Sequence, residues 1–267
     1  LNTPDALRPK HHASHKGSHG DVAVIGGEGM ATHGMGMTGA AILAATAALH
    51  AGAGRVILSL LSGQASDSAP PDVMQRQFEQ LALDQLHVVC GCGGGTAVQA
   101  VLPQVLQRSA HLVLDADGLN ALAQNTQLQN LLQQRAQMQD RPHGTVLTPH
   151  PLEAARLLGC STAQVQNDRI PSAQELADRY QCTVVLKGSG TVIAAPAQTP
   201  RINTSGNGRL AIGGTGDVLA GLIGARMAQG LNAFDAACAA VAQHGQLADD
   251  WPPNQALTAS RLAASLT

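Results

Sequence analysis

The stretch Gly213-Gly214-Thr215-Gly216-Asp217-Val218-Leu219-Ala220-Gly221 places a carboxylate directly behind a glycine run and in front of an apolar pattern. Apolar residues recur at helical spacing as far as Met227, and Gly230 supplies a stop signal, so the pattern predicts a helix over residues 215–229. The first amides of a helix have no partner within it and lie at the positive end of its dipole. We therefore expect the opening turn, with Gly214, Thr215 and Gly216, to bind a phosphate.

Asp217 has two interpretations. A carboxylate repels a ground-state phosphate, so one interpretation is that Asp217 contacts a hydroxyl and removes its proton during phosphoryl transfer. The alternative is that Asp217 only caps the start of the helix. The stretch alone leaves both open.

The composition is typical of one domain without a nucleic-acid partner. With 267 residues and 44% hydrophobic content, the chain is long enough to bury a single large core. Its 16 basic and 18 acidic residues give a net charge of -2 without a basic block, so we expect no nucleic-acid partner. The aromatic residues are one Trp, one Tyr and two Phe, so a base or ring is expected to rest on aliphatic and backbone surfaces.

Two further features indicate where the protein works. The polar residues 1–16 lack the apolar segment of a secretory signal, and the longest apolar run, residues 40–48, is too short to cross a bilayer, so we expect no membrane partner. Five scattered cysteines do not form a disulfide framework and favour a reducing, cytoplasmic setting. Cys90 and Cys92 are expected to pack as small apolar residues. The N-terminal histidines His11, His12, His15 and His19 are expected to be an incidental solvated cluster.

We expect residues 1–14 to be a linker or N-terminal arm and residues 15–267 to form one domain. From Asp21 onward, short apolar runs alternate with longer runs rich in alanine and leucine. That alternation predicts an α/β fold with a mostly parallel central sheet and helices on both faces. The expected strands are residues 22–25, 56–60, 87–90, 112–114, 145–147 and 183–186. The expected helices are residues 38–50, 97–107, 152–158, 163–180, 215–229, 233–248 and 258–265.

Glycine and polar residues directly follow five of the expected strands. In an open parallel sheet, ligands bind outside the carboxyl ends of the strands, so these segments are expected to converge on one crevice. They are Gly26-Gly27-Glu28-Gly29, Gly91-Cys92-Gly93-Gly94-Gly95, Asp115-Ala116-Asp117, Thr148-Pro149-His150-Pro151 and Lys187-Gly188-Ser189-Gly190-Thr191. The chain carries no complete dinucleotide fingerprint, Walker loop or nucleophile elbow.

Some residues of these segments have competing interpretations. Asp115 and Asp117 are suited to hold Mg²⁺, directly or through water, while Asp117 is equally suited to cap the next helix. His150 lies between two prolines with a rigid backbone, which favours contact with a substrate over core packing.

Two loops are candidates for holding a nucleotide. Lys187-Gly188-Ser189-Gly190-Thr191 separates two apolar runs and is expected to form a hairpin loop along a nucleotide, with a plain surface turn as the alternative. Asn203-Thr204-Ser205-Gly206-Asn207-Gly208 precedes the helix carrying Asp217 and is expected to supply amides and carboxamides to the same crevice, unless it is an ordinary turn.

Five motifs, in one order along nearly the whole chain, resemble those of the ADP-dependent NAD(P)H-hydrate dehydratase family. The resemblance runs from about Ser14 to the end of the chain. It rests on His15-Lys16-Gly17-Ser18-His19-Gly20, Asp115-Ala116-Asp117-Gly118-Leu119-Asn120, Thr148-Pro149-His150-Pro151, Val185-Leu186-Lys187-Gly188 with Thr191, and residues 213–221. It implies a ribokinase-like fold without a separate lid domain.

The resemblance also implies a repair reaction, in which NADH or NADPH damaged by water addition to the nicotinamide ring is restored at the expense of ADP, with release of AMP and phosphate. A ring hydroxyl is a poor leaving group, whereas its phosphate ester departs as the ring nitrogen pushes electrons outward. The implied chemistry is therefore phosphorylation followed by elimination, with Mg²⁺ on the phosphates. The implied partners are hydrated NADH or NADPH and an adenine nucleotide, ADP or ATP, in a homo-oligomer for which a tetramer is one option.

Matching positions imply roles for single residues. Asp217 would be the base on the ring hydroxyl, and Ala40, Gly93 and His150, with Asp217, would contact the hydrated dinucleotide. The nucleotide is expected to be held by Lys187, Gly188, Ser189, Gly190, Thr191, Asn207, Gly214, Thr215 and Gly216. The ligands of the metal ion stay unassigned.

Two segments depart from the family's usual pattern. Where the family usually has Gly-Pro-Gly-Leu-Gly, this chain has Gly91-Cys92-Gly93-Gly94-Gly95, which predicts a more flexible loop. Where the family usually has Thr-Pro-His-Pro-Gly-Glu, Leu152 precedes Glu153 here and adds bulk near His150. Many family members carry a preceding epimerase domain, and the linker-like start favours this chain being the carboxyl-terminal half of such a protein.

Two other functions fit the same residues. An ATP-dependent kinase of a small alcohol, such as a vitamin precursor or a sugar, would use the same anion site and the same acid. A non-catalytic nucleotide sensor would bind nucleotide at the same turn without turnover.

Overall fold

In the computed structural model, which describes residues 12–13, 16–138 and 144–266, nine strands form one sheet in the order β3-β2-β1-β4-β5-β6-β7-β8-β9. Neighbouring strands from β3 to β7 are parallel, and β8 is antiparallel to both β7 and β9. The predicted mostly parallel sheet is confirmed. The strands are β1 (Asp21–Gly26), β2 (Arg55–Leu60), β3 (Met74–Gln75), β4 (His87–Cys90), β5 (His111–Leu114), β6 (Gly144–Leu147), β7 (Thr183–Leu186), β8 (Val192–Ala194) and β9 (Arg201–Ile202).

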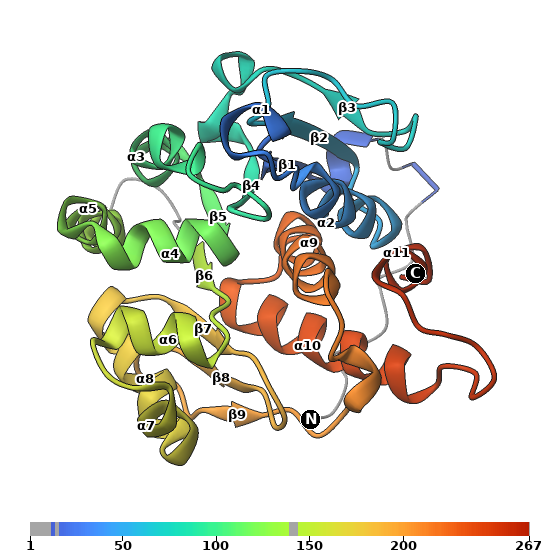
Figure 1. Cartoon of the computed structure of the whole chain (residues 1–267). Coiled ribbons are helices and arrows are strands. Elements are labelled where there is room, and N and C mark those ends of the chain that lie inside the picture. The colour runs from blue at the N-terminus through green and yellow to red at the C-terminus, as the bar shows by residue number, and fades with distance from the viewer. Residues whose placement is uncertain (1–11, 14–15, 139–143, 267) are drawn as a thin grey trace.

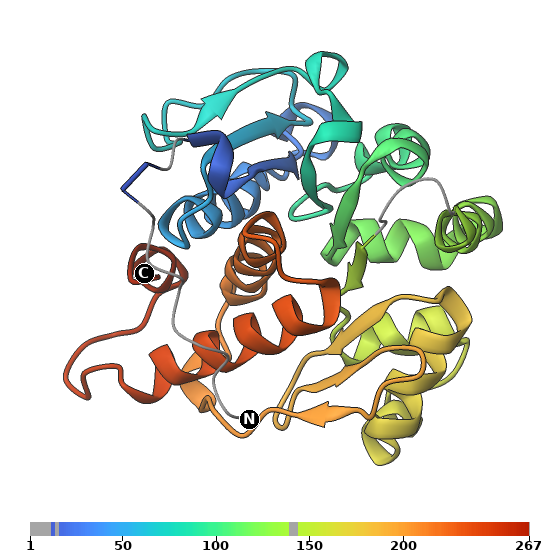
Figure 2. The same cartoon turned by 180° about the vertical axis from the view of Figure 1, so that it is seen from behind.

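Helices cover both faces of the sheet, as predicted (Figures 1 and 2). One face carries α2 (Thr38–His50), α9 (Thr215–Ala228), α10 (Ala233–Asp249) and α11 (Ala259–Ala264). The other face carries α3 (Val98–Arg108), α4 (Ala116–Gln124), α5 (Thr126–Gln137), α6 (Pro151–Leu158), α7 (Thr162–Asn167) and α8 (Arg169–Tyr180). The short helices are α1 (Met30–His33), η1 (Lys16–His19), η2 (Phe78–Gln80), η3 (Leu83–Gln85) and η4 (Gly208–Leu210). None of the described helices combines the length and apolar character needed to cross a membrane.

The central strands bury side chains on both faces. In β1, Val22 and Val24 pack into the core with α2 and α9, whereas Ala23 and Ile25 pack into the core with α3 and α4. Because both faces are buried, the sequences of these strands are continuous apolar runs and do not alternate between apolar and polar residues.

Helix α9 lies in the middle of its layer, between α2 and α10 (Figure 1). Its close approach to α2 depends on Gly221, because a Cβ there would overlap the carbonyl oxygen of Ala44. A Cβ at Gly216 would lie 3.3 Å from Nζ of Lys187, which directly follows β7. The start of α9 is thus at the edge where the parallel strands end.

One predicted helix is wrong in extent. Residues 163–180 do not form a single helix but are divided between α7 and α8 at Asp168, whose φ of -126° and ψ of 55° are not helical. Pro171 explains the break, because in a continuous helix its ring would clash with the carbonyl of Asn167.

The elements that were not predicted include α4, α5, β3 and β9. The strands β3 and β9 have only two residues each, which is too short to leave a pattern. Of the predicted N-terminal arm, residues 1–11 and 14 lie outside the described residues, as does His15.

Candidate active site

The predicted glycine-built start of α9 is present. The helix begins at Thr215 behind Gly214, which has a φ of 92° and would be strained with a side chain. A Cβ at Gly214 would also lie 2.7 Å from Cδ1 of Leu43. Within the described residues, the amides of Thr215, Gly216 and Asp217 donate no hydrogen bond to a protein group. The start of α9 therefore offers three donors to an anion.

Two side chains hold the start of α9 in place. The Thr215 hydroxyl donates to the carbonyl oxygen of Leu210 at 2.8 Å. Nε2 of the buried His244 lies 3.0 Å from the Thr215 carbonyl oxygen, so this nitrogen carries the ring proton. Burial lowers the pKa of His244 to about 4, so the ring is neutral at pH 7. Sequence reasoning missed His244, because nothing in an alanine-rich helix marks one histidine as buried.

We expect His244 to make the protein less stable in acid. An unfolded histidine gains its proton near pH 6.5, whereas the folded ring does so near pH 4. Between these values the unfolded state binds more protons than the folded state. The contribution of His244 to the free energy of unfolding is therefore complete above pH 6.5, and the free energy of unfolding falls by about 2 kcal/mol on going to pH 5. Denaturant melts at pH 7 and pH 5 measure this fall. The fall should be smaller in His244→Gln, and an equal fall in both proteins would contradict the assignment.

Asp217 is the third residue of α9 and is half-buried. The N-cap position belongs to Gly214, and within the described residues the Asp217 carboxylate accepts no amide of the helix start, so the capping alternative is wrong. Burial, and then the charge of Asp115, raise the pKa of Asp217 to about 6. The group is mostly ionised at pH 7, and a pKa in this range suits a general base.

Asp115 and Lys187 form an ion pair beside the start of α9. Nζ of Lys187 lies 2.6 Å from Oδ1 of Asp115, and the Thr148 hydroxyl donates to the same oxygen at 2.7 Å. Burial alone would lower the pKa of Lys187, but Asp115 and Glu153 raise it above its ordinary value, so the amine is charged. Because a Cβ at Gly216 would almost touch this amine, Lys187 adds a positive charge next to the free amides.

The glycine loop after β4 is anchored by two carboxylates. Asp117 accepts the amide of Gly95 at 2.8 Å. The buried Glu28 accepts the amides of Thr96 and Ala97 through Oε1, at 3.1 and 2.9 Å. These anchors hold a loop that its glycine content predicted to be more flexible. They also show that Asp117 fixes this loop and does not cap α4.

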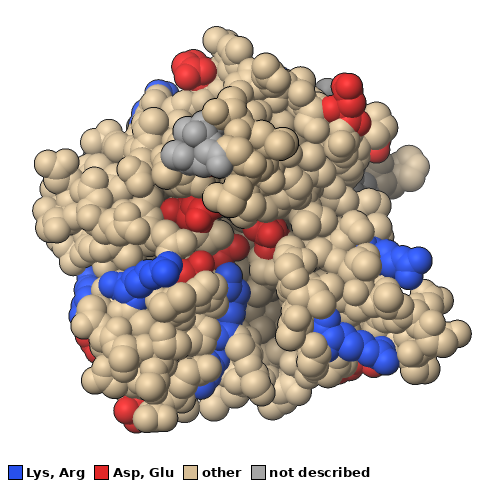
Figure 3. Space-filling model, viewed as in Figure 1, with Lys and Arg blue, Asp and Glu red and all other residues tan. Residues whose placement is uncertain are grey.

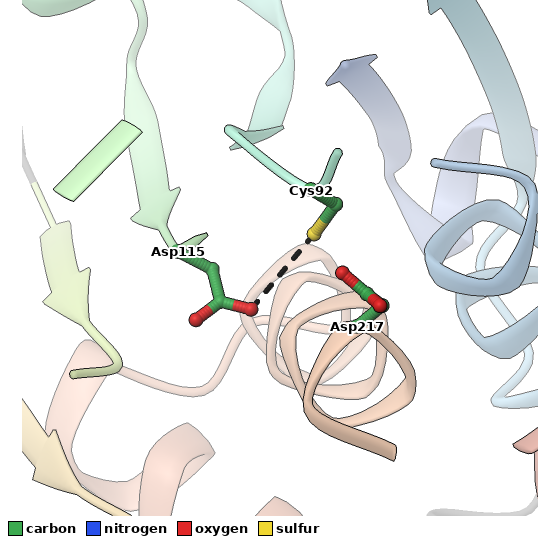
Figure 4. A group of neighbouring side chains, drawn as sticks. All are labelled: Cys92, Asp115 and Asp217. Carbon is green, nitrogen blue, oxygen red and sulfur yellow. Dashed lines mark hydrogen bonds between the residues drawn. The ribbon is translucent and has the colours of Figure 1, made fainter. Parts of the chain in front are cut away.

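Cys92, Asp115 and Asp217 face a common space (Figure 4). One ligand atom from each lies within 4.8 Å of the others. This donor set mixes sulfur with carboxylates, whereas Mg²⁺ takes oxygen ligands in a near-octahedral arrangement. Moreover, Asp115 and Asp117, the two expected Mg²⁺ ligands, are each bonded to a protein donor. Among the described residues these groups do not form a dedicated magnesium site.

His150 is the N-cap of α6 and forms a capping box with Glu153. Its Nδ1 accepts the amides of Leu152 and Glu153, at 3.1 and 3.2 Å, so the ring proton is on Nε2, which lies 3.3 Å from Oε1 of Glu153. Burial and then Lys187 lower the pKa of His150, so the ring is neutral. The half-exposed ring thus offers a ligand its face and not a free nitrogen. The Leu152 side chain, expected to add bulk here, is 44% exposed.

Ala40 and Gly93, two predicted substrate contacts, are neighbours. Gly93 has a φ of 58°, and a Cβ there would lie 2.9 Å from Cβ of Ala40. His150, the third predicted contact, is within electrostatic reach of Lys187 and Asp115. The structure therefore brings α2, the glycine loop and the start of α6 to the same edge of the sheet as Asp217.

The predicted hairpin loop connects β7 to β8. Arg169 donates through Nη2 to three carbonyl oxygens of the loop and the strand end before it, and the Thr191 hydroxyl donates to the Gly188 carbonyl oxygen at 2.9 Å. Ser189 and Gly190 are exposed and line a surface pocket of about 340 Å³. The loop is thus held by Arg169 and Thr191, and Ser189 and Gly190 are accessible at its surface.

The loop before α9 is tied to α10. Nδ2 of Asn207 donates to the carbonyl oxygen of Ala248 and to Oδ1 of Asp249, both at 2.9 Å, and its Oδ1 accepts the amide of Arg209 at 3.0 Å. These bonds are typical of an ordinary turn. They engage the Asn207 side chain, a predicted nucleotide contact, within the chain.

The outer surface is hollowed where these segments meet. Figure 3 shows a hollow near the middle of this face, with Asp and Glu side chains gathered at its rim and Lys and Arg side chains below it. Charges of both signs at one hollow suit a site where a carboxylate takes a proton while cations stabilise a phosphoryl group in transfer.

A family model described as NAD(P)H-hydrate dehydratase matches residues 22–267. This chain belongs to the NAD(P)H-hydrate dehydratase family. This chain is 37% identical to an ADP-dependent (S)-NAD(P)H-hydrate dehydratase of Neisseria meningitidis, over 100% of the chain and 88% of that relative. It is 40% identical to the bifunctional NAD(P)H-hydrate repair enzyme of Escherichia coli, over 91% of the chain and 45% of that relative. The chain thus spans about half the length of the bifunctional relatives.

Solved structures agree with this family. The ADP/ATP-dependent NAD(P)H-hydrate dehydratase of Bacillus subtilis, co-crystallised with ATP and Mg²⁺, is similar with a TM-score of 0.77 and 30% identity, covering 97% of this chain and 92% of that one. A ribokinase-like superfamily protein of Enterococcus faecalis has a TM-score of 0.79 and 26% identity, covering 97% of this chain and 89% of that one. The NAD(P)H-hydrate dehydratase family member thus has the predicted ribokinase-like fold.

Proposed function

We propose that this chain dehydrates hydrated NADH and NADPH at the expense of ADP, with release of AMP and phosphate. One observation carries the proposal: the Asp217 carboxylate lies beside three free amides of α9 and near the Lys187 amine. This arrangement puts a base for a hydroxyl next to a site for a migrating phosphoryl group. Membership of the dehydratase family supplies the substrate class.

The reaction begins at the hydroxyl of the hydrated ring. Asp217 accepts the hydroxyl proton, and the hydroxyl oxygen bonds to the terminal phosphorus of ADP. The bond from that phosphorus to the bridging oxygen breaks, and AMP leaves. The amides of α9 and Lys187 stabilise the charge on the phosphoryl oxygens. The lone pair of the ring nitrogen then expels phosphate, and loss of a proton from the neighbouring ring carbon restores the double bond.

The two ligands are assigned to neighbouring parts of the site around Asp217. We place the hydrated ring toward Ala40, Gly93 and the neutral His150, whose ring face suits an uncharged ring. The nucleotide lies toward the hairpin loop of residues 187–191, with its terminal phosphate at the start of α9. When bound on the phosphates, Mg²⁺ compensates part of their charge.

Incubation with hydrated NADPH, ADP and Mg²⁺ tests the proposal. We expect the absorbance of reduced nicotinamide to return, with one AMP formed for each NADPH and no change when nucleotide is omitted. A parallel reaction with ATP measures the nucleotide preference. A stable phosphorylated alcohol formed from ATP would favour a kinase, and no absorbance with either nucleotide would rule out the dehydratase.

A methyl group at Gly216 is expected to weaken the use of nucleotide. Alanine is a better helix former than glycine, so Gly216→Ala should fold, but its Cβ would lie 3.3 Å from Nζ of Lys187, beside the free amides. Loss of charge-assisted hydrogen bonds to the phosphate should raise the KM for ADP by about tenfold or more. The control is Gly208→Ala, where a Cβ meets nothing within 4 Å. Equal KM values for the two variants would contradict the anion site.

A further inference from the structure

We propose that Cys92 is a positioning residue for the base: its thiol bridges Asp115 and Asp217 and holds the Asp217 carboxylate in place for proton transfer. The inference rests on the proposed role of Asp217. Figure 4 shows the Cys92 sulfur pointing into the space between the two carboxylates. From the sequence we expected Cys92 to pack as a small apolar residue, because no second Cys or His pair lies at ligand spacing nearby.

The backbone around Cys92 fixes the direction of its side chain. The residue is fully buried, and its carbonyl oxygen accepts the amide of Gly27 at 3.0 Å. It stands between Gly91 and Gly93, whose φ angles of 113° and 58° are open to glycine and strained for other residues. A Cβ at Gly26 would overlap the Cys92 carbonyl oxygen, so the two segments are already in close contact. The backbone that carries the thiol is therefore held in place, and the buried side chain is drawn pointing toward the carboxylates (Figure 4).

The thiol meets the carboxylate oxygens that other donors leave open. Sγ lies 4.0 Å from Oδ2 of Asp115, whereas Lys187 and Thr148 both bond to Oδ1. Within the described residues, no hydroxyl, amide, amine or guanidinium donates to the carboxylate of Asp217. One S–H shared between two carboxylates separates their charges and gives the base its protein donor.

Loss of the thiol has a predictable effect on the base. Burial, Asp115 and Asp117 raise the pKa of Asp217, and Cys92 and Lys187 oppose them. Without the thiol, the carboxylate loses one of the two groups that favour its charged form. It also gains room to rotate in the gap left by the sulfur.

The kinetic test compares Cys92→Ala, Cys92→Ser and Cys90→Ala. We expect Cys92→Ala to lower kcat by about tenfold at pH 7, the worth of a hydrogen bond to a charged group. The KM for ADP should stay unchanged, and the acid limb of the pH profile should move to higher pH. Serine keeps a donor and should restore most of the rate, while Cys90→Ala, in the other core cluster, should match the wild type. An unchanged profile in Cys92→Ala, or equal losses with alanine and serine, would overturn the proposal.

A spectroscopic test does not depend on activity. The S–H stretching band of Cys92, identified as the difference between wild type and Cys92→Ser, should lie at the lower frequency of a bonded thiol. It should move upward in Asp217→Asn, because an amide is a weaker acceptor than a carboxylate. An S–H band at the same frequency in Asp217→Asn and in the wild type would rule out the hydrogen bond from Cys92 to Asp217, whether or not the protein catalyses the proposed reaction. A shifted band in an inactive protein would support the bridge and point to failure of the proposed function instead.

Discussion

Replacing Asp217 with Asn is expected to lower the dehydration rate by at least about a hundredfold, because an amide cannot accept the hydroxyl proton. Asn has nearly the same size, so the start of α9 should be undisturbed. Since burial and Asp115 raise the pKa of Asp217 to about 6, the ionised group destabilises the folded state at pH 7. The variant should therefore melt at the same temperature as the wild type or slightly higher.

Steady-state rates across pH test this role of Asp217. The wild-type rate should fall as the pH drops through about 6, where the carboxylate gains its proton. The residual rate of Asp217→Asn should lack this limb. Near-normal turnover in a folded variant would remove Asp217 from the mechanism.

Replacing Lys187 with Met is expected to lower both the rate and the stability. Without the amine, the phosphoryl charge has lost a preorganised partner, which costs about a hundredfold in rate. The buried Asp115 also loses the cation 2.6 Å from its carboxylate, and a buried charge left without its partner costs about 3–5 kcal/mol of unfolding free energy. Rates and denaturant melts measure the two losses separately.

The double variant Lys187→Met with Asp115→Asn separates the two roles of the amine. Removing both charges should return most of the stability, because no carboxylate is then left unpaired. The rate should stay low, since the phosphoryl group still lacks its cation. Recovery of the rate along with the stability would mean that Lys187 serves only to pair Asp115.

The parallel sheet could be predicted because its central strands are buried on both faces and leave continuous apolar runs. The failures have local causes. Helix α5 was missed because glutamine dominates its sequence, and one of its three buried positions, beside Leu128 and Leu132, is Arg135. The guanidinium of Arg135 can be buried because it donates hydrogen bonds to Thr145 and to carbonyl oxygens. No hydrophobic pattern in the sequence reveals such hydrogen bonds.

The site was predictable as a set of segments but not as a set of contacts. Parallel topology was enough to bring the ends of β4 to β7 together, and the glycine run marked the anion site. The pairing of Asp115 with Lys187 joins residues 72 positions apart, and the sequence does not say which carboxylate meets the amine. The same holds for His244, which supports Thr215 from α10, and for Cys92, whose direction depends on the φ angles of two glycines.

The central claim is that Asp217 takes the proton of the ring hydroxyl, the hydroxyl oxygen bonds to the terminal phosphorus of ADP, and that oxygen then leaves the ring as part of phosphate. The most direct measurement uses hydrated NADPH whose ring hydroxyl carries ¹⁸O, turned over with ADP and Mg²⁺ in ordinary water. Mass spectrometry of the products should find the label in inorganic phosphate, one ¹⁸O for each NADPH restored. Label found in water, with unlabelled phosphate, would mean that dehydration and ADP cleavage are separate events, and it would contradict the account.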